Sequence, residues 1–276
     1  MATEPLSFLF RNLQKGDLGY RLGRLVKHTQ ADIIVLAECK YGNDELVATL
    51  QEQCEHKYHV PASLSEKVRI VTRLSKNCII DRFNSELGHY TIRSVRVPNL
   101  PELLLCGVHF HSKVSWNEVD QALESTNMAR DIARFEEETD HQHTIVLGDF
   151  NMNPFEAGLT GAQALNAVMT ASLCRERIVA GKKYQRFYNP MWGFFGDQTL
   201  GPAGTHYFRS NKPTNTYWHM LDQVLLRPSL TGCLGQLRIV EEDGAESLLM
   251  NGRPDSMRGS DHLPIAFSLD LTRIEQ

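Results

Sequence analysis

The chain has 276 residues, of which 42% are hydrophobic and 22% charged, and its 29 Lys and Arg against 33 Asp and Glu give a net charge of −4. These values exclude an intrinsically disordered chain, and the length suits one large α/β or all-β domain over residues 1–276. We expect no secretory signal and no membrane span, because no basic segment precedes an apolar run and no such run approaches roughly 18 residues.

The first quarter of the sequence predicts two buried strands and two helices. Residues 6–10 form a strand that ends near Asn12, and residues 33–37 form a second strand that ends at Glu38. Asp17 has the character of an N-cap for the helix between them, and Asn43 is expected to cap a second helix that runs through Cys54. The apolar stripe of the first helix consists of Leu18, Leu22, Leu25 and Val26.

Residues 68–111 contain four short apolar segments joined by short links. From Ile92 onward, apolar and polar residues alternate, which is typical of half-buried strands. The segments are residues 68–74, 78–83, 89–97 and 103–111. Together they predict an antiparallel meander.

The second half combines a long helix with further strands. Residues 117–140 predict a helix whose apolar stripe consists of Val119, Leu123, Met128, Ile132 and Phe135. Buried strands are predicted at residues 144–147, 221–226, 237–240 and 265–271. Strand-rich runs with helices at intervals indicate an α/β fold of two packed mixed sheets with helices on the outer faces, a four-layer α/β/β/α sandwich.

The six cysteines argue against zinc or disulfide chemistry. None lies closer than fifteen residues to the next, so the sequence has no C-x-x-C pair. Reduced, structural thiols in a cytoplasmic protein are the favoured interpretation, and a disulfide framework is the weaker alternative.

Polar side chains stand where the predicted buried strands stop. They are Asn12, Glu38, His109 or His111, Asp149 with Asn151, Asp222, and Asp261 with His262. Carboxylates and imidazoles are costly to desolvate unless they are paired, hydrogen-bonded or bound to a cation. Any one of them alone is more simply an ordinary loop residue, but the whole ordered set predicts one site at an edge of the sheets.

Two motifs in this set resemble those of the endonuclease/exonuclease/phosphatase superfamily. Residues 148–154 read G-D-F-N-M-N-P and resemble its G-D-F-N-x-x-P, while residues 260–265 resemble its S-D-H-x-P-[IV]. Residues 221–226 are similar to its L-D-x-[IV] element, and Asn12 and Glu38 fall where the family has its strand-ending N and E. The resemblance spans residues 6–270 and implies the four-layer fold and a phosphoesterase activity.

The sequence also departs from the family pattern. Gln14 stands where some nuclease members have an acidic residue, Gln223 follows Asp222, and the W-C-D-R motif of inositol polyphosphate phosphatases is absent. Residues 109–112, H-F-H-S, resemble the H-L-x-S strand end through His109, whereas His111-Ser112 resembles the H-S of deoxyribonucleases. Residues two apart on a strand face the same side, so either histidine could reach the site, and we favour His109.

The resemblance implies a role for each of these residues. Mg²⁺ or Mn²⁺ would be held by Glu38, Asp261 and Asn12, since these cations prefer oxygen ligands and the site has no cysteine and more carboxylates than histidines. The resemblance further implies in-line attack by a water that Asp149 activates and Asn151 helps to hold. His262 would donate a hydrogen bond to the phosphate, and Asp222 would support that imidazole. His109 would be a second donor or acid.

The substrate class is read from residues 175–218. This segment has seven Lys and Arg against two Asp and Glu and holds 10 of the chain's 23 aromatic residues. Basic groups interleaved with aromatic rings suit single-stranded or frayed nucleic acid, although the same rings could simply pack a long loop onto the core. The candidate substrate-binding residues are Lys182, Lys183, Arg186, Tyr188, Trp192 and Arg209.

Three functions therefore remain open at this stage. The favoured one is a metal-dependent nuclease or phosphodiesterase acting on nucleic acid, in a protein expected to be a monomer. The second is a phosphatase or phosphodiesterase acting on a small or lipid phosphoester, and the acidic remainder of the chain favours it. The third is a catalytically silent interaction module, which the intact motifs disfavour.

Overall fold

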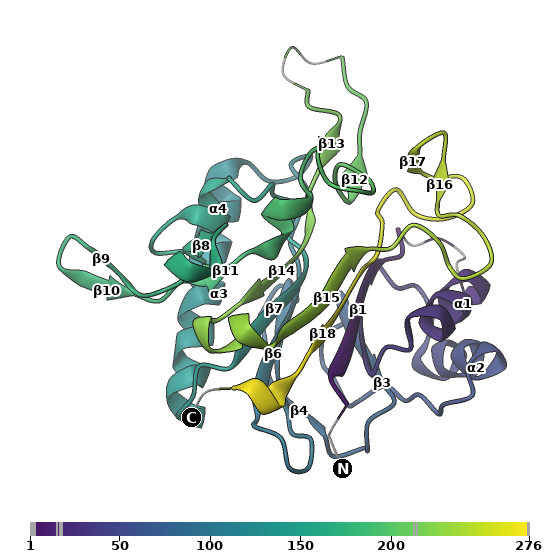
Figure 1. Ribbon diagram of the computed structural model, residues 1–276, viewed down its shortest axis with the longest axis horizontal. Coiled ribbons are helices and arrows are strands. Elements are labelled where there is room, and N and C mark those ends of the chain that lie inside the picture. The colour runs from purple at the N-terminus through teal and green to yellow at the C-terminus, as the bar shows by residue number, and fades with distance from the viewer. Residues whose placement is uncertain (1–3, 15, 17–18, 212, 214, 275–276) are drawn as a thin grey trace.

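Two β-sheets packed face to face form the body of the protein, a computed structural model that describes residues 4–14, 16, 19–211, 213 and 215–274 (Figure 1). The first sheet has the order β15 (Leu234–Ile239), β18 (Ile265–Leu269), β1 (Leu6–Asn12), β2 (Ile33–Ala37) and β3 (Val68–Thr72). The second has the order β4 (Ile79–Asn84), β5 (Tyr90–Val95), β6 (Leu103–His109), β7 (Thr144–Asp149), β14 (Asp222–Leu226), β11 (Phe187–Tyr188) and β8 (Ala167–Val168). Both sheets are mixed: β1 pairs parallel with β2, β6 pairs parallel with β7, and most other neighbours are antiparallel.

The helices lie on the outer faces of the two sheets, so the fold is the expected four-layer sandwich. Figure 1 shows α1 (Gly19–Thr29) and α2 (Asn43–Gln53) beside the first sheet, with α3 (Glu118–Thr139) and the short α4 (Ala157–Thr160) beside the second. The predicted N-cap Asp17 and stripe residue Leu18 lie outside the described residues. The second helix begins at Asn43 itself, and Gly42 is its N-cap.

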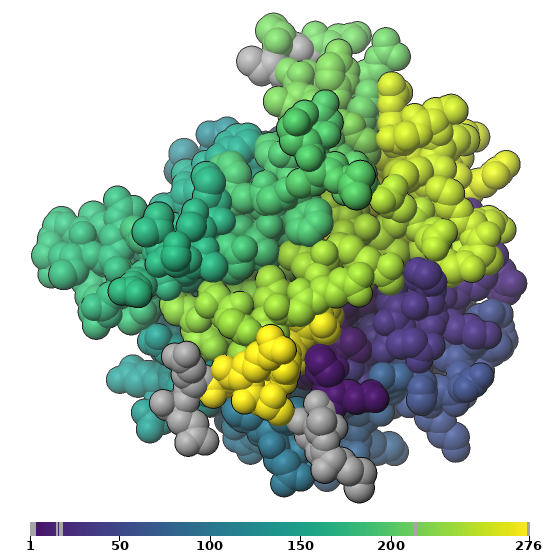
Figure 2. Space-filling model, viewed as in Figure 1, coloured from purple at the N-terminus to yellow at the C-terminus, as the bar shows by residue number. Residues whose placement is uncertain are grey.

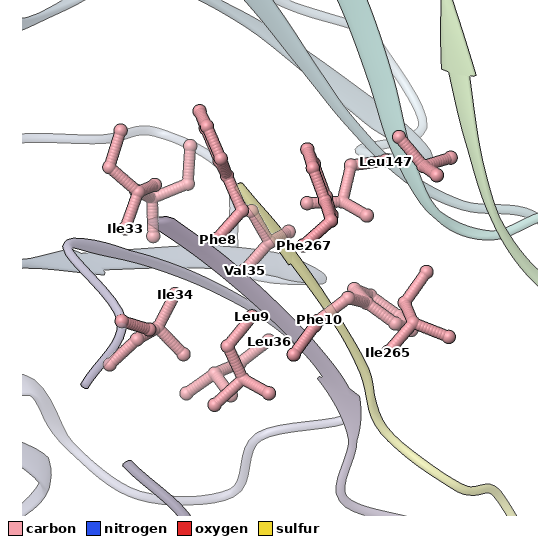
Figure 3. Close-up of a cluster of buried hydrophobic side chains, with 14 of the residues drawn as sticks. Phe8, Leu9, Phe10, Ile33, Ile34, Val35, Leu36, Leu147, Ile265 and Phe267 are labelled. Atoms are coloured by element: carbon pink, nitrogen blue, oxygen red, sulfur yellow. The ribbon is translucent and has the colours of Figure 1, made fainter. Parts of the chain in front are cut away.

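Alternation along the central strands supplies two apolar faces to the first sheet. Figure 3 shows Phe8, Ile33 and Val35 on the side facing Leu147 of the second sheet, and Leu9, Ile34 and Leu36 on the opposite side. These side chains are almost completely buried, as is expected for strands covered on both faces. The rings of Phe8 and Phe267 stack with centroids 4.8 Å apart and tie β1 to β18.

Two expectations about these elements are wrong in detail. The segment from Val68 pairs with β2 in the first sheet, so the meander contains only β4, β5 and β6. In α3, Val119 and Leu123 are 75% and 60% exposed, and the buried positions near its N-terminus are polar. The reason is that Gln121 turns inward and donates hydrogen bonds to two loop carbonyls, at His111 and Asn151, each at 3.0 Å.

Three two-stranded ribbons extend from the sandwich. They are β9 (Arg177–Val179) with β10 (Lys182–Tyr184), β12 (His206–Tyr207) with β13 (Trp218–His219), and β16 (Leu249–Met250) with β17 (Arg253–Pro254). In Figures 1 and 2 the β9–β10 hairpin projects at the left, whereas the β12–β13 hairpin stands at the top of the molecule. The two parts of the basic and aromatic segment therefore occupy different places on the surface.

All six cysteines are free thiols, and four of them are buried: Cys78, Cys106, Cys174 and Cys233. Burial raises the pKa of the Cys106 thiol well above its ordinary value, which suits a small core residue. Among the described residues, no helix has the length and apolar character needed to cross a membrane.

Candidate active site

The register of the central strands brings the polar strand ends of both sheets to one edge of the sandwich. In the first sheet Asn12 pairs with Ala37, so Glu38 follows directly beside it. In the second sheet Asp149 pairs with His109 on one side and with Asp222 on the other. His262 lies three residues before β18, whose first residue, Ile265, pairs with Phe10 next to the same end of β1.

A hydrogen bond from Asn12 joins the two sheets at this edge. Its Nδ2 donates to Asp149 Oδ2 at 3.0 Å and lies 3.5 Å from Glu38 Oε1. His109 Nε2 lies 3.4 Å from the same Glu38 oxygen. That contact is the main reason why the pKa of Glu38 is lowered, against the opposing effect of burial.

The carboxylate of Asp222 contacts Nδ1 of the His262 imidazole. Nδ1 of His262 lies 2.8 Å from Oδ2 and 3.0 Å from Oδ1 of Asp222, and Asp222 is completely buried. Burial opposes the charge on the imidazole, but the negative charges of Asp222 and Asp149 outweigh it and raise the pKa of His262 to about 10. The imidazole is therefore a cation at neutral pH.

Asp149 is a buried carboxylate with a fixed orientation. Its Oδ1 accepts a hydrogen bond from the backbone N–H of Asn151 at 2.8 Å, while Oδ2 accepts from Asn12. Burial is the main cause that raises its pKa; the charge of His262 opposes this, and that of Asp222 adds to it. A carboxylate whose pKa is raised is a better proton acceptor, which suits a general base.

The backbone around these side chains explains two features of the family motifs. Glu38 and Asn151 have φ of 50° and 51°, left-handed conformations that turn each side chain at the end of its strand. At Gly148 a Cβ atom would lie 2.0 Å from the carbonyl oxygen of Val108 on the neighbouring strand. Only glycine fits between β6 and β7 at this position, which accounts for the first residue of G-D-F-N.

The side chain of Gln14 holds the loop that carries Asp261. Its backbone N–H donates to Asn12 Oδ1 at 2.8 Å, and its Oε1 accepts from the backbone N–H of Asp261 at 3.1 Å. Asp261 is thereby tied to Asn12, which in turn contacts Glu38 and Asp149. Glu38 and Asp261 therefore belong to one edge of the molecule rather than to opposite faces.

The donor set at this edge fits a hard divalent cation. Glu38, Asp261 and Asn12 offer carboxylate and amide oxygens. Asp261 Oδ1 is buried and, within the described ranges, accepts no hydrogen bond, although the His262 imidazole lies 4.0 Å from it, so a bound cation would give this oxygen a direct partner. Among the described residues, carboxylate and imidazole atoms converge within 4.8 Å of one another in two sets, His206 with Asp261 and His262, and Asp149 with Asp222 and His262, and Glu38 belongs to neither set.

Several residues expected at the site lie elsewhere. His111 packs its ring against His89 and Trp116, with centroids 4.6 and 5.0 Å away, and of the two histidines only His109 contacts Glu38. Tyr188 pairs with Leu226, about 13 Å along β14 from Asp222.

The other predicted substrate-binding residues are scattered. Lys182 and Lys183 are exposed on the β9–β10 hairpin, where Lys183 forms an ion pair with Glu176. Arg186 donates a hydrogen bond to the carbonyl of Leu173 at 2.9 Å, and Trp192 packs beside Phe155 with centroids 6.2 Å apart. Arg209 is exposed on the loop that follows β12.

Sequence patterns did not single out the residues that β12 brings to the site. Thr205 Oγ1 accepts hydrogen bonds from the backbone N–H groups of Leu221 and Asp222, at 3.2 and 3.1 Å. His206 places Nε2 3.5 Å from Asp261 Oδ2 and its ring centroid 4.6 Å from that of His262. No apolar run precedes these residues, so a search for polar strand ends passes over them.

A sandwich of two mixed sheets with carboxylates, amides and imidazoles gathered at one edge defines a phosphoester hydrolase of the α/β/β/α class. The chain belongs to the Endonuclease/Exonuclease/phosphatase family, whose sequence model matches residues 12–262. A comparison with curated proteins gives no match.

Solved structures share this fold. An endonuclease/exonuclease/phosphatase family protein from Bacteroides thetaiotaomicron superposes with a TM-score of 0.59 at 14% identity, covering 99% of this chain and 98% of that chain. Truncated TDP2 from Caenorhabditis elegans gives 0.56 at 14% identity, with 96% and 97% covered. D. rerio TDP2 complexed with single strand DNA product gives 0.54 at 16%, with 96% and 99% covered. At such identities the likeness shows the fold.

Proposed function

We propose that this protein is a divalent-metal-dependent phosphodiesterase that cleaves single-stranded or frayed nucleic acid. The family and the geometry of the site support hydrolysis of a phosphoester. The observation that favours nucleic acid over a small phosphoester is a row of aromatic rings that begins at the buried His262 and ends at the exposed Phe208 of the β12–β13 hairpin.

In the proposed reaction, water attacks phosphorus in line with the leaving oxygen. Asp149 takes the proton from the water, and Asn12 and the backbone of Asn151 keep its two oxygens in place. The Nε2–H of the His262 imidazolium donates to a non-bridging oxygen as charge develops there. The new P–O bond forms as the opposite one breaks, and the leaving oxygen departs as a hydroxyl after it gains a proton, which we assign to His109.

The cation, Mg²⁺ or Mn²⁺, would be held by Glu38, Asp261 and Asn12. When bound, it neutralises charge on the phosphate and favours the attacking water as hydroxide. Gln14 and His109 serve this site by keeping Asp261 and Glu38 in place.

The row consists of His262, which lies three residues before β18, and of His206 and Phe208 on the hairpin. His206 and Phe208 are stacked at an interplanar angle of 21° with centroids 6.5 Å apart, and Phe208 is 55% exposed. The other face of the hairpin is occupied, because Tyr207 packs on Tyr217 and Trp218 and lies under Arg253. A supported hairpin with one exposed phenyl ring, followed by the exposed Arg209, suits a base stacked next to a bound phosphate.

A substrate panel tests the proposal. Single-stranded DNA, single-stranded RNA, plasmid, an inositol phosphate, a phospholipid vesicle and bis-nitrophenyl phosphate are incubated with Mg²⁺ or Mn²⁺, with EDTA controls. We expect the highest kcat/KM on single strands, and an affinity for them that falls steeply with salt. Preferred turnover of the inositol phosphate or the phospholipid would establish the second function instead, and no turnover of any phosphoester would leave the silent module.

We also propose that the protein works as a monomer in the cytoplasm. The six free thiols support a reducing compartment. Light scattering of the purified protein tests whether it is a monomer. Reaction of its thiols in extracts made under alkylating conditions tests whether they are reduced in the cell.

A further inference from the structure

His206 is fixed beside Asp261 by its backbone as well as by its side chain. The N–H of Leu263 donates to the carbonyl of Thr205 at 2.7 Å, and His206 forms an isolated antiparallel bridge with His262. The short strand β12 is thus paired through its backbone with the segment that carries the S-D-H motif. The position of the imidazole is therefore set by the fold and not by a mobile loop.

The polar atoms of this pair are poorly satisfied without a further partner. His206 Nε2 lies 3.5 Å from Asp261 Oδ2, at the limit of a hydrogen bond, and the side chain of His206 is only 14% exposed. Within the described part of the chain, Asp261 Oδ1 is buried and has no hydrogen-bond partner, while the His206 nitrogen that faces Asp261 is Nε2. One carboxylate and one imidazole held loosely face to face leave room for an ion that binds both.

We propose that His206 is a ligand of the divalent cation, adding one nitrogen to the oxygens of Asp261, Glu38 and Asn12. This inference rests on the proposed metal dependence and adds a consequence for the choice of metal. Mg²⁺ prefers oxygen ligands, whereas Mn²⁺, which is similar in size, accepts an imidazole ligand more readily. A mixed nitrogen and oxygen set should therefore bind Mn²⁺ in preference to Mg²⁺.

His262 is not needed as a ligand in this arrangement. Its Nδ1 is held by Asp222, and its Nε2 lies 4.0 Å from Asp261 Oδ1, which leaves Nε2 free to meet the phosphate. The two neighbouring histidines thus divide the work: His206 faces the cation and His262 faces the substrate.

The test measures metal binding directly, by calorimetry of Mn²⁺ and Mg²⁺ with the full chain and with His206→Gln. We expect the substitution to raise the Kd for Mn²⁺ at least about tenfold and to change the Kd for Mg²⁺ much less. The matched control is His219→Gln, since His219 pairs with His206 across the hairpin with rings 6.1 Å apart and hydrogen-bonds to Asn153 instead of a carboxylate. Its Kd for Mn²⁺ should equal that of the unmodified protein.

Pulsed electron paramagnetic resonance of bound Mn²⁺ gives a second measurement, whose first part uses the unmodified protein alone. Directly bound imidazole nitrogen produces a coupling to Mn²⁺ that should be present in the unmodified protein and lost in His206→Gln. The inference is overturned if the unmodified protein shows no nitrogen coupling, if the coupling survives the substitution, or if the substitution weakens Mn²⁺ and Mg²⁺ equally. If the unmodified protein binds neither metal, it is the proposed metal dependence itself that fails.

Discussion

His262 and Asp222, forty residues apart in the chain, meet in a two-point contact in which Nδ1 of the imidazole lies 2.8 and 3.0 Å from the two carboxylate oxygens. This contact places the proton of Nδ1 toward Asp222 and leaves Nε2 facing the other side. Because the raised pKa of His262, about 10, keeps the ring charged, its second N–H is a donor throughout the neutral range.

Replacing Asp222 with Asn should remove most of the activity without unfolding the protein. Asparagine keeps the shape of the side chain but removes the charge that raises the pKa of His262 and permits the wrong ring tautomer. We expect kcat to fall by a factor of about 10²–10⁴, measured by single-turnover kinetics on the best substrate of the panel. A folded Asp222→Asn protein that keeps more than a tenth of the rate would contradict this role.

Replacing Asp149 with Asn should separate activity from stability. The general base is lost, so kcat should fall at least about 100-fold. The raised pKa of Asp149 means that folding disfavours its charged form, so stability is lost as the pH rises above the unfolded pKa of about 4. The Asn variant should therefore melt at the same or a higher temperature than the unmodified protein at pH 7 in EDTA, as followed by circular dichroism. A lower melting temperature would show that the carboxylate is needed for folding.

Much of this edge could be predicted from the sequence because the chain signals a buried strand clearly. The runs before Asn12, Glu38 and Asp149 are apolar and short, so the residue at which each strand leaves the core can be read directly. The structure brings these three side chains together with Asp222 and His262.

Sequence reasoning missed His206, whose position depends on strand pairing, and it could not locate the substrate-binding residues from composition alone. β12 has only two residues, so nothing in its sequence indicates that His206 pairs beside His262. The excess of basic and aromatic residues over 175–218 describes the composition of the segment and does not indicate where each side chain lies in the fold. That segment contains Tyr188, which lies on β11 beside the far end of β14, as well as Phe208, which stacks on His206.

Removal of divalent metal should abolish turnover and lower stability. Among the described residues, the ion pairs of Glu38 and Asp261 are formed with histidines, so a bound cation should stabilise the folded form. At a free concentration one hundred times Kd the gain is about 2.7 kcal/mol, visible as a rise in melting temperature when MnCl₂ or MgCl₂ is added after EDTA. Glu38→Gln should reduce this rise. Turnover that survives EDTA would reject the metal-dependent mechanism.

Phe208→Ala should weaken binding of single strands and spare a substrate that has no base. Loss of one stacked base costs about 1–3 kcal/mol, so KM for single-stranded DNA should rise about 5- to 150-fold, while KM for bis-nitrophenyl phosphate stays within twofold. Quenching of a 2-aminopurine placed next to the scissile phosphate reports the stacking itself. Phe155→Ala removes a ring of similar exposure, 50%, beside Trp192, and should leave the quenching intact. Equal loss in both variants would place the stacking elsewhere.

The ion pair between Glu136 and Arg227 should contribute to the stability of the second sheet and have no effect on kcat. Arg227 donates from Nε and Nη2 to the two oxygens of Glu136, at 2.7 and 3.0 Å, and both residues are buried. Glu136 belongs to α3, Arg227 follows β14, and the guanidinium also lies 3.9 Å from the ring centre of Phe187 in β11.

Arg227→Met should lower the free energy of unfolding by about 3–5 kcal/mol, because it leaves the Glu136 carboxylate buried without its partner. The double variant with Glu136→Leu removes both charges and should regain most of that loss, since a desolvated ion pair contributes little over apolar residues of similar size. Urea unfolding followed by tryptophan fluorescence measures all three proteins, and kcat measured well below each melting point should be unchanged. If the single and double variants lose equal stability, the pair acts through packing on Phe187 and the charge argument does not hold.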